Sequence, residues 1–283
     1  MSLLLHISDT HFGTEQPQVV AALQALALER KPDLLVFSGD VTQRARSSQF
    51  AAARRFCDSL GIARSLVLPG NHDIPLLNIA ARLLWPYAGY QRAFGKDLEP
   101  TVDTDDLLVV GINTTRARRH KNGEVSARQV ERVARQLAAA RPGQLRVVVT
   151  HQPAAVLKPQ DNHDRLRGAE PALQAWSAAG ADLVLGGHIH LPYVMEVRLA
   201  RTMWCVQAGT AVSSRVRGGT ANSVNLLHWQ AQAPGAPRRC VVERCDFDAA
   251  SGRFAGAAPR VLLLGDPAAV HVPGDATHVV GRG

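Results

Sequence analysis

Short apolar runs alternate with longer segments of helical periodicity along the first 190 residues of the chain. The predicted strands cover residues 2–8, 33–38, 65–69, 106–113, 145–151 and 181–188. The predicted helices cover residues 18–30, 48–61 and 126–140. Strands separated by helices are typical of α/β layers in which the sheet is largely buried. We therefore expect an α/β protein.

The later apolar runs, residues 203–209, 223–229 and 238–247, follow one another without a helical pattern between them. We expect these runs to be antiparallel strands that complete a second sheet. The Pro- and Gly-rich residues 230–239 are then a hairpin loop. The pattern thus favours a four-layer αββα sandwich of two mixed β-sheets flanked by helices over a doubly wound fold.

The length of 283 residues favours one domain with appendages, which we place at residues 1–250. Within it, residues 74–100 form a long aromatic-containing excursion that we expect to contain helices and to wall or cap a site. Residues 251–283 are rich in Gly, Ala and Pro, and we expect a partly irregular C-terminal extension.

The composition mainly excludes classes of protein. The apolar fraction is 46%, and no apolar run approaches the ~20 residues that span a bilayer, so we expect a cytoplasmic protein without a membrane span. The four cysteines lack CxxC spacing and are predicted to be buried thiols. The net charge of +8 is dispersed without a dense basic tract, so a nucleic-acid partner is open but not favoured.

Polar side chains follow the predicted strands directly, at five separate junctions. They are Asp9, His11, Asp40, Asn71, His151, His188 and His190. Strand carboxyl ends converge on one edge in layered α/β folds, which is where ligands bind. Each residue alone has an ordinary structural explanation, but five matching junctions are very unlikely by accident. Imidazole and oxygen donors without thiolate predict a site for Mn, Fe, Zn or Co rather than Ca.

In order along the chain, these residues form the motifs D-x-H (9–11), G-D (39–40), G-N-H-D (70–73), H (151) and G-H-x-H (187–190). This set resembles that of the calcineurin-like metallophosphoesterases, over roughly residues 1–210. The resemblance implies the αββα sandwich already expected from the strand pattern, and two divalent metal ions. Residues 38–43 and 208–218 are most similar to the class III cyclic-nucleotide phosphodiesterase branch.

The resemblance also implies roles for individual residues. One metal ion would be bound by Asp9, His11 and His190, the other by Asn71, His151 and His188, and Asp40 would bridge both. His72 would face the substrate and either stabilise the transition state or protonate the leaving group. Asp73 would orient the ring of His72, although a hydrogen bond that stabilises the turn is an equally good interpretation of Asp73.

The implied reaction is hydrolysis of a phosphodiester by a hydroxide held between the two metal ions. Cyclic nucleotides or related small phosphodiesters are the expected substrates. Arg215 and Arg217, and Arg165 and Arg167 in the loop after His151, are candidates for substrate binding, with solvated loop positions as the alternative.

Other functions remain open at this point. Related enzymes with these motifs cleave DNA, so a nuclease is one alternative. Another alternative is a lipid-linked nucleotide pyrophosphatase of the UDP-2,3-diacylglucosamine type, since the apolar residues 74–90 could line an acyl pocket. The simpler interpretation of residues 74–90 is a helix packed on the core. A non-catalytic scaffold is disfavoured because no ligand of the motif set is missing. A homodimer is plausible for this branch.

Overall fold

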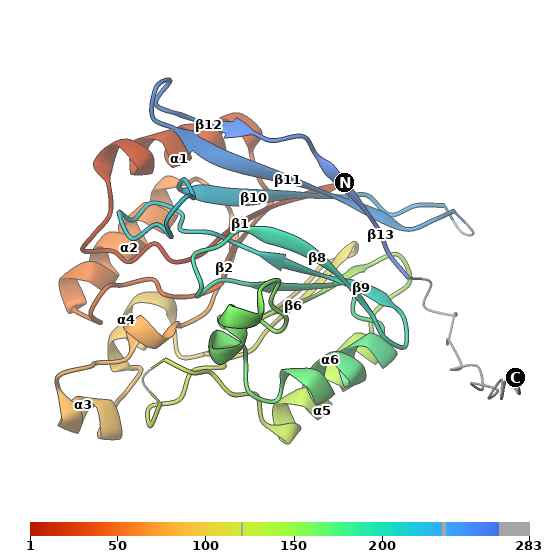
Figure 1. Ribbon diagram of the computed structural model, residues 1–283, viewed down its shortest axis with the longest axis horizontal. Coiled ribbons are helices and arrows are strands. Elements are labelled where there is room, and N and C mark those ends of the chain that lie inside the picture. Colours follow the sequence, from red (N-terminus) through yellow and green to blue (C-terminus); the bar gives the residue numbers. More distant parts are fainter. Residues whose placement is uncertain (120, 234–235, 266–283) are drawn as a thin grey trace, which may run out of the picture.

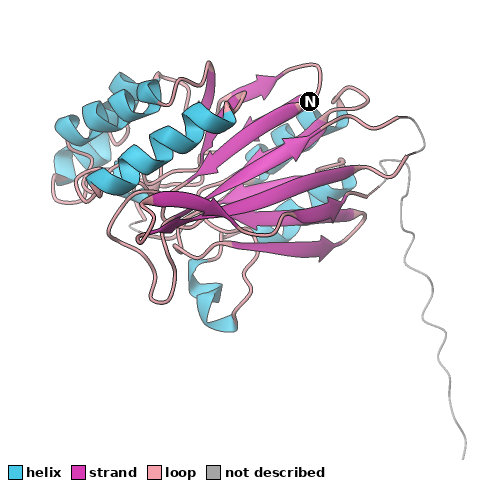
Figure 2. Cartoon of the chain, turned by 90° about the horizontal axis from the view of Figure 1, so that it is seen from above, coloured by secondary structure: helices cyan, strands magenta, loops and turns pink. Residues whose placement is uncertain are grey.

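The computed structural model describes residues 1–119, 121–233 and 236–265. Two β-sheets pack face to face, and helices cover their outer faces (Figure 1). Figure 2 shows the same layers from above, with helices in front of the strands and behind them. The expected α/β sandwich of two mixed sheets is confirmed.

The first sheet is built on three parallel strands, with the strand order β12-β11-β10-β1-β2-β3 and with β13 beside β11. Its strands are β1 (Ser2–Ile7), β2 (Leu34–Phe37), β3 (Arg64–Val67), β10 (Ser223–Trp229), β11 (Arg239–Asp248), β12 (Arg253–Gly256) and β13 (Arg260–Leu263). The helices α1 (Pro17–Arg30) and α2 (Ser47–Ser59) connect β1 to β2 and β2 to β3, and they cover the outer face.

The second sheet has the order β4-β5-β6-β7-β9-β8. Its strands are β4 (Thr101–Asp103), β5 (Leu107–Gly111), β6 (Leu145–Val149), β7 (Leu183–Gly186), β8 (Tyr193–Arg198) and β9 (Thr202–Gln207). The strands β5, β6, β7 and β9 are parallel, and β4 and β8 are antiparallel edges. The helices α5 (Ala127–Ala138) and α6 (Ala169–Ala178) cover its outer face.

The apolar core occupies three layers, one between the sheets and one under each pair of helices. Along β1, Leu4 packs between the sheets, while Leu5 and Ile7 pack under the helices. A strand that is covered on both faces needs apolar residues at consecutive positions, which explains the unbroken apolar runs in the sequence.

The late strands are divided between the two sheets, which corrects the expectation that they complete the second one. β9 lies parallel to β7 in the second sheet, whereas β10 and β11 extend the first sheet from β1. The apolar pattern of these strands suits either sheet. Only long-range pairing, such as that of Leu4 with Leu227, decides which sheet a strand joins. The hairpin between β10 and β11 is confirmed for its described residues.

The predicted boundary at residue 250 is too early. Both β12 and β13 pair with β11, and Phe254 and Leu262 are buried, so these strands belong to the first sheet. The rest of the predicted extension, residues 266–283, lies outside the described residues. The excursion at residues 74–100 does contain two helices, α3 (Ile79–Leu84) and α4 (Ala88–Phe94).

The prediction of buried cysteine thiols is confirmed. Cys57, Cys205, Cys240 and Cys245 are buried free thiols. His6 is fully buried on β1, where its Nε2 lies 3.0 Å from Ser38 Oγ, and burial lowers its pKa to about 3. Among the described residues, the helices are all too short or too polar to cross a membrane.

Candidate metal centre

The polar residues predicted at the strand ends lie together at one edge of the sandwich. Asp9, Asp40 and the 3-10 turn Asn71–Asp73 follow β1, β2 and β3 of the first sheet. His151 follows β6, and His188 and His190 follow β7 of the second sheet. The carboxyl ends of strands from both sheets thus meet at one place, where the side chains form two clusters of potential metal ligands. A third group, His11, Asp40 and His72, overlaps both clusters.

The first cluster consists of Asp9, His11 and His190. Asp9 Oδ1 lies 3.6 Å from His11 Nε2 and 3.4 Å from His190 Nε2, and the two Nε2 atoms are 3.3 Å apart. Among the described residues, none donates a hydrogen bond to the buried Asp9 Oδ1. His190 Nδ1 faces the Arg215 carbonyl and Thr210 Oγ1, and a hydrogen on Nδ1 leaves the lone pair on Nε2. A lone pair and a free carboxylate oxygen that converge in this way suit a cation.

The second cluster contains Asp40, His151 and His188, with the amide of Asn71 beside them. His151 Nδ1 lies 2.9 Å from the Ser38 carbonyl, which can only accept, so the hydrogen is on Nδ1. The lone pair of Nε2 then points toward Asn71 Oδ1 at 3.2 Å and Asp40 Oδ1 at 3.3 Å. Three electron-rich atoms repel one another unless a proton or a metal ion lies between them, so this donor set fits a metal ion.

Asp40 is shared between the clusters. Its Oδ1 faces His151, and its Oδ2 lies 3.7 Å from His11 Nε2. Burial opposes charge on both Asp40 and His151. Their mutual attraction nevertheless holds the pKa of the Asp40 carboxyl well below its ordinary value and raises the pKa of His151 to about 9. The site therefore favours positive charge strongly, whether as protons or as metal ions.

Backbone strain is concentrated at these residues. Five non-glycine residues of the two clusters have positive φ angles, between 42° and 75°: Asp9, His11, Asp40, His188 and His190. Such conformations cost roughly 1–3 kcal/mol each and persist where the surrounding structure enforces them, commonly at functional sites. These backbone conformations direct the side chains of successive turns toward one another.

The G-N-H-D turn is held against Asp40 by close packing. A side chain on Gly70 would collide with the backbone nitrogen and Oδ1 of Asp40. His72 N donates to Asp40 Oδ1 at 2.8 Å, and Asp73 accepts from Gly70 N at 2.8 Å. These contacts fix the position of the Asp40 carboxylate relative to Asn71 and His72.

Gly70→Ala is expected to displace this turn and to lower metal affinity, because the new methyl group has no space beside Asp40. Titration of the chelated variant with Mn²⁺ should give a weaker Kd than the parent protein. Gly95→Ala is a suitable control, since a Cβ there contacts nothing within 4 Å, although its positive φ adds some strain. Unchanged Mn²⁺ affinity in Gly70→Ala would show that the turn adapts.

Asp73 does not orient His72, so that part of the expectation is wrong. Both oxygens of Asp73 are used by Gly70 N, Val41 N and Thr42, whose backbone and hydroxyl both donate at 2.8 Å. His72 Nδ1 instead lies 3.0 Å from the Gln43 carbonyl, which orients the ring. The turn-stabilising interpretation of Asp73 is the one that the structure shows. The orienting role of the Gln43 carbonyl was not visible in the sequence, because the backbone carbonyl of any residue can supply it.

Comparison with known proteins agrees with this geometry. Residues 3–192 match the family described as calcineurin-like phosphoesterase. The chain belongs to this family. A probable cyclic nucleotide phosphodiesterase from Rhodococcus erythropolis is 23% identical over 92% of both chains. The glycerophosphodiester phosphodiesterase GpdQ of Enterobacter lignolyticus is 33% identical, over 25% of this chain and 29% of that protein.

Solved structures share the fold of this phosphoesterase. A dimetal phosphatase from Danio rerio superposes with a TM-score of 0.61 at 12% identity, covering 93% of this chain and 99% of that one. The purple acid phosphatase PPD1 from yellow lupin superposes with a TM-score of 0.66 at 11% identity, covering 93% of this chain and 53% of that one. The predicted family and fold are therefore confirmed.

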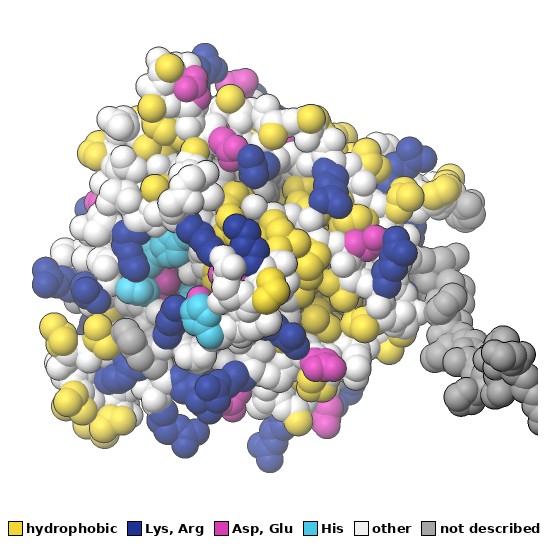
Figure 3. Space-filling view, viewed as in Figure 1, with side chains coloured by type: hydrophobic (Ala, Val, Ile, Leu, Met, Phe, Trp, Pro, Cys, Tyr) yellow, Lys and Arg dark blue, Asp and Glu magenta, His cyan; other side chains and the backbone are white. Residues whose placement is uncertain are grey.

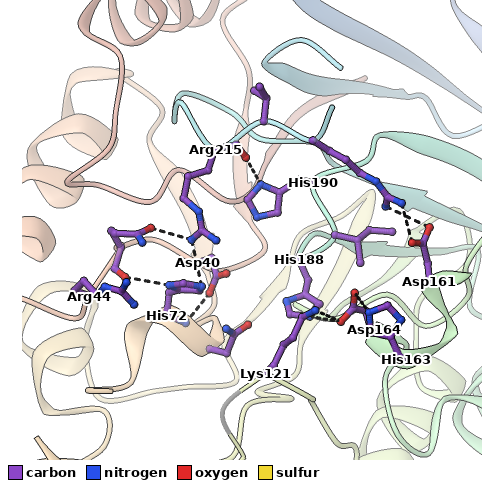
Figure 4. A pocket seen from close by; sticks show the side chains of 15 residues that line it. Asp40, Arg44, His72, Lys121, Asp161, His163, Asp164, His188, His190 and Arg215 are labelled. Carbon is purple, nitrogen blue, oxygen red and sulfur yellow. Dashed lines mark hydrogen bonds and ion pairs between the residues drawn. The ribbon is translucent and has the colours of Figure 1, made fainter. Parts of the chain in front are cut away.

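A cavity of about 740 Å³ opens over the clusters of this phosphoesterase, and Figure 4 shows the side chains that line it. Arg215 reaches its centre, where Nη1 lies 3.3 Å from His72 Nε2, 3.4 Å from His11 Nδ1 and 2.9 Å from Gln43 Oε1. Arg217 lines the same cavity but is paired with Asp161 at 2.8 Å. Of the two arginines, Arg215 is the one aimed at the centre.

Arg165 and Arg167 are not brought into this cavity. Arg165 lies 3.9 Å from Glu170 at the start of α6, and the backbone of Arg167 bonds to Gly123 and Val125. Their expected role in substrate binding is not supported by this placement. Charge and proximity to His151 in the sequence were a poor guide, because the 3-10 helix Pro159–Asp164 turns the chain away before residue 165.

The sequence interpretation missed Asp164. Its Oδ1 lies 2.7 Å from Lys121 Nζ and 3.7 Å from His188 Nε2, and its Oδ2 lies 3.1 Å from His163 Nε2. Attraction to His188 and Lys121 outweighs burial and holds the pKa of Asp164 below its ordinary value. The two acidic residues in the loop after His151 were the available signal, but only the fold places one of them against His188.

Proposed function

We propose that this chain is a two-metal phosphodiesterase that hydrolyses small phosphodiesters, with cyclic nucleotides among the candidates. The observation that carries the proposal is Asp40, a buried carboxylate whose two oxygens face two separate clusters of metal-ligand side chains. The curated relative named a probable cyclic nucleotide phosphodiesterase supports the choice of diesters. A homodimer and a cytoplasmic location stay predictions.

The residues that would hold the metal ions follow from the clusters. Asp9, His11 and His190 would bind one ion, Asn71, His151 and His188 the other, and Asp40 both. Imidazole, carboxylate and amide donors suit Mn, Fe or Zn. When bound, two such ions supply Lewis-acid activation of the phosphoryl group and of the attacking water.

His72 and Arg215 would act on the substrate from the open side of the cavity. The Gln43 carbonyl fixes His72 Nδ1, so Nε2 is the ring atom that faces the substrate and can exchange a proton with the leaving oxygen. Arg215 lies beside that atom and carries a permanent charge for the phosphoryl oxygens. Asp73 holds the turn in place without touching substrate.

The proposal is tested by comparing hydrolysis of bis(p-nitrophenyl) phosphate with hydrolysis of p-nitrophenyl phosphate. The protein is first treated with a chelator, and Mn²⁺, Fe²⁺ or Zn²⁺ is then added back. We expect diester hydrolysis that disappears on chelation and returns with metal. Preference for the monoester would indicate a phosphatase, and the lack of turnover with every metal would contradict the proposal.

Asp164→Ala is expected to weaken metal binding about 10- to 100-fold, the usual effect of losing a carboxylate that orients a histidine ligand. The measurement is the affinity of the chelated protein for Mn²⁺ by calorimetry. Asp161→Ala is the matched control: this residue lies in the same 3-10 helix and pairs with Arg217. Equal affinities in both variants would exclude a role for Asp164 in orienting His188.

A further inference from the structure

The segment around α3 exposes large apolar side chains beside the candidate site. Leu77 is 88% exposed, Trp85 65% and Leu83 64%, and α3 contains no buried residue. α3 is therefore not packed on the core, whereas α4 is, through the buried Tyr90. The simpler expectation for this segment, a helix packed on the core, thus holds for α4 alone. Figure 3 shows hydrophobic side chains at the lower left, where Figure 1 places α3, on the same face as the histidines and bordered by basic side chains. Contiguous exposed apolar surface usually marks a binding site.

A groove of about 710 Å³ runs along this segment. Leu77, Ala81 and Trp85 line it from the side of α3, and Ala88 and Gly89 line it from α4. This volume is within the range of roughly 300–1,000 Å³ that is typical of small-molecule sites. The groove is open to solvent, and its lining is more apolar than polar.

The groove and the catalytic cavity meet at Arg44, which lines both. Figure 4 shows Arg44 beside His72 at the edge of the catalytic cavity. Arg46 and Arg92 also line the groove, and no acidic residue does so among the described residues. A ligand that fits both spaces has an anionic group at the histidines and an apolar part along α3.

We propose that the groove binds the alkyl chain of an amphiphilic phosphodiester whose phosphate lies in the catalytic cavity. The proposal rests on the proposed phosphodiesterase function and specifies its substrate class. Charge complementarity favours this occupant: Arg44, where the two spaces meet, and Arg215 in the cavity attract the phosphate, and the adjoining apolar walls of the groove accept the chain.

The first test compares p-nitrophenyl methyl phosphate with p-nitrophenyl octyl phosphate, both at monomeric concentrations. Complete burial of one methylene group strengthens binding about fourfold. Since the groove is open to solvent, burial of the chain is incomplete, and we expect the octyl ester to exceed the methyl ester at least about tenfold in kcat/KM. Equal values for the two esters would overturn the proposal.

Leu77→Ser and Leu83→Ser form a matched pair of variants. Both remove an exposed leucine from the same segment, but only Leu77 lines the groove. We expect the octyl-to-methyl ratio to fall severalfold in Leu77→Ser and to stay at the parent value in Leu83→Ser. An equal fall of the octyl-to-methyl ratio in both variants would indicate nonspecific adsorption of the octyl ester. If both variants instead dissociate a dimer and leave the octyl-to-methyl ratio unchanged, the surface is a subunit interface. Either result would overturn the proposal.

A binding measurement separates failure of the groove from failure of the phosphodiesterase function. Trp85 is exposed, whereas Trp176, Trp204 and Trp229 are buried, so fluorescence changes on binding come from Trp85. Dodecylphosphocholine, below its micelle concentration, should shift the emission of the chelated protein to the blue, and Trp85→Phe should abolish the shift. A shift without turnover of any ester would refute the enzymatic function alone, and turnover without a shift would refute the groove alone.

Discussion

Asp40→Ala is expected to lose both metal ions and to lower kcat/KM for bis(p-nitrophenyl) phosphate by about 10³-fold or more, since metal ions contribute several kcal/mol to charge stabilisation in such reactions. The physical reason is that each oxygen of this carboxylate faces a different cluster. Its removal leaves His151 and Asn71 without the shared negative charge that offsets the repulsion between two nearby cations. The measurement is metal content per chain by mass spectrometry, together with the rate.

Asp58→Ala is the control for Asp40→Ala. Asp58 pairs with Arg54 on the exposed face of α2 and does not line the cavity, so its loss should change neither metal content nor rate. Circular dichroism of both variants checks that they fold. Two metal ions per chain in Asp40→Ala would contradict the assignment of this residue as the shared ligand.

His72→Ala is expected to keep both metal ions and to lose about 10²- to 10⁴-fold in kcat, the usual contribution of a positioned acid or base. The side chain lines the cavity from the turn that also supplies Asn71, but its Nδ1 is bonded to Gln43 and its Nε2 faces Arg215. The loss should be larger for a poor leaving group, such as an alkoxide, than for p-nitrophenolate if His72 protonates that group. Metal content and rates with both classes of ester are the measurements.

His228→Ala is the corresponding control, because this histidine lies on β10 beside Glu243 and away from the cavity. Its variant should keep the parent rate with both leaving groups. Full activity in His72→Ala would remove this residue from the mechanism. An equal loss for good and poor leaving groups would favour stabilisation of the transition state over proton donation.

The positions of the candidate ligands could be predicted from the sequence because each follows an apolar run directly. A buried strand can end at a polar residue only where the chain leaves the core, and parallel strands end at the same edge. Asp9 and Asp40 therefore converge at the ends of the adjacent parallel strands β1 and β2, whereas His151 joins them only because the second sheet packs with its strand ends at the same edge. The positive φ angles at Asp9 and Asp40 were not predictable, since aspartate rarely adopts them without tertiary support.

Contacts between distant segments were not accessible to the same reasoning. Asp164 is distant from His188 in the sequence, and the Gln43 carbonyl is a backbone group that no side-chain pattern reveals. The position of β10 beside β1 was missed for the same reason, because its apolar pattern satisfies either sheet. Local patterning predicted which residues are buried or polar, whereas their partners depend on long-range packing.

The central claim is that one shared carboxylate joins two cation sites, and the most direct measurement is an anomalous difference map from crystals grown with Mn²⁺. We predict two peaks, both in contact with Asp40. One should also contact Asp9, His11 and His190, and the other Asn71, His151 and His188. The absence of peaks at these side chains, or a single peak that Asp40 does not contact, would contradict the account.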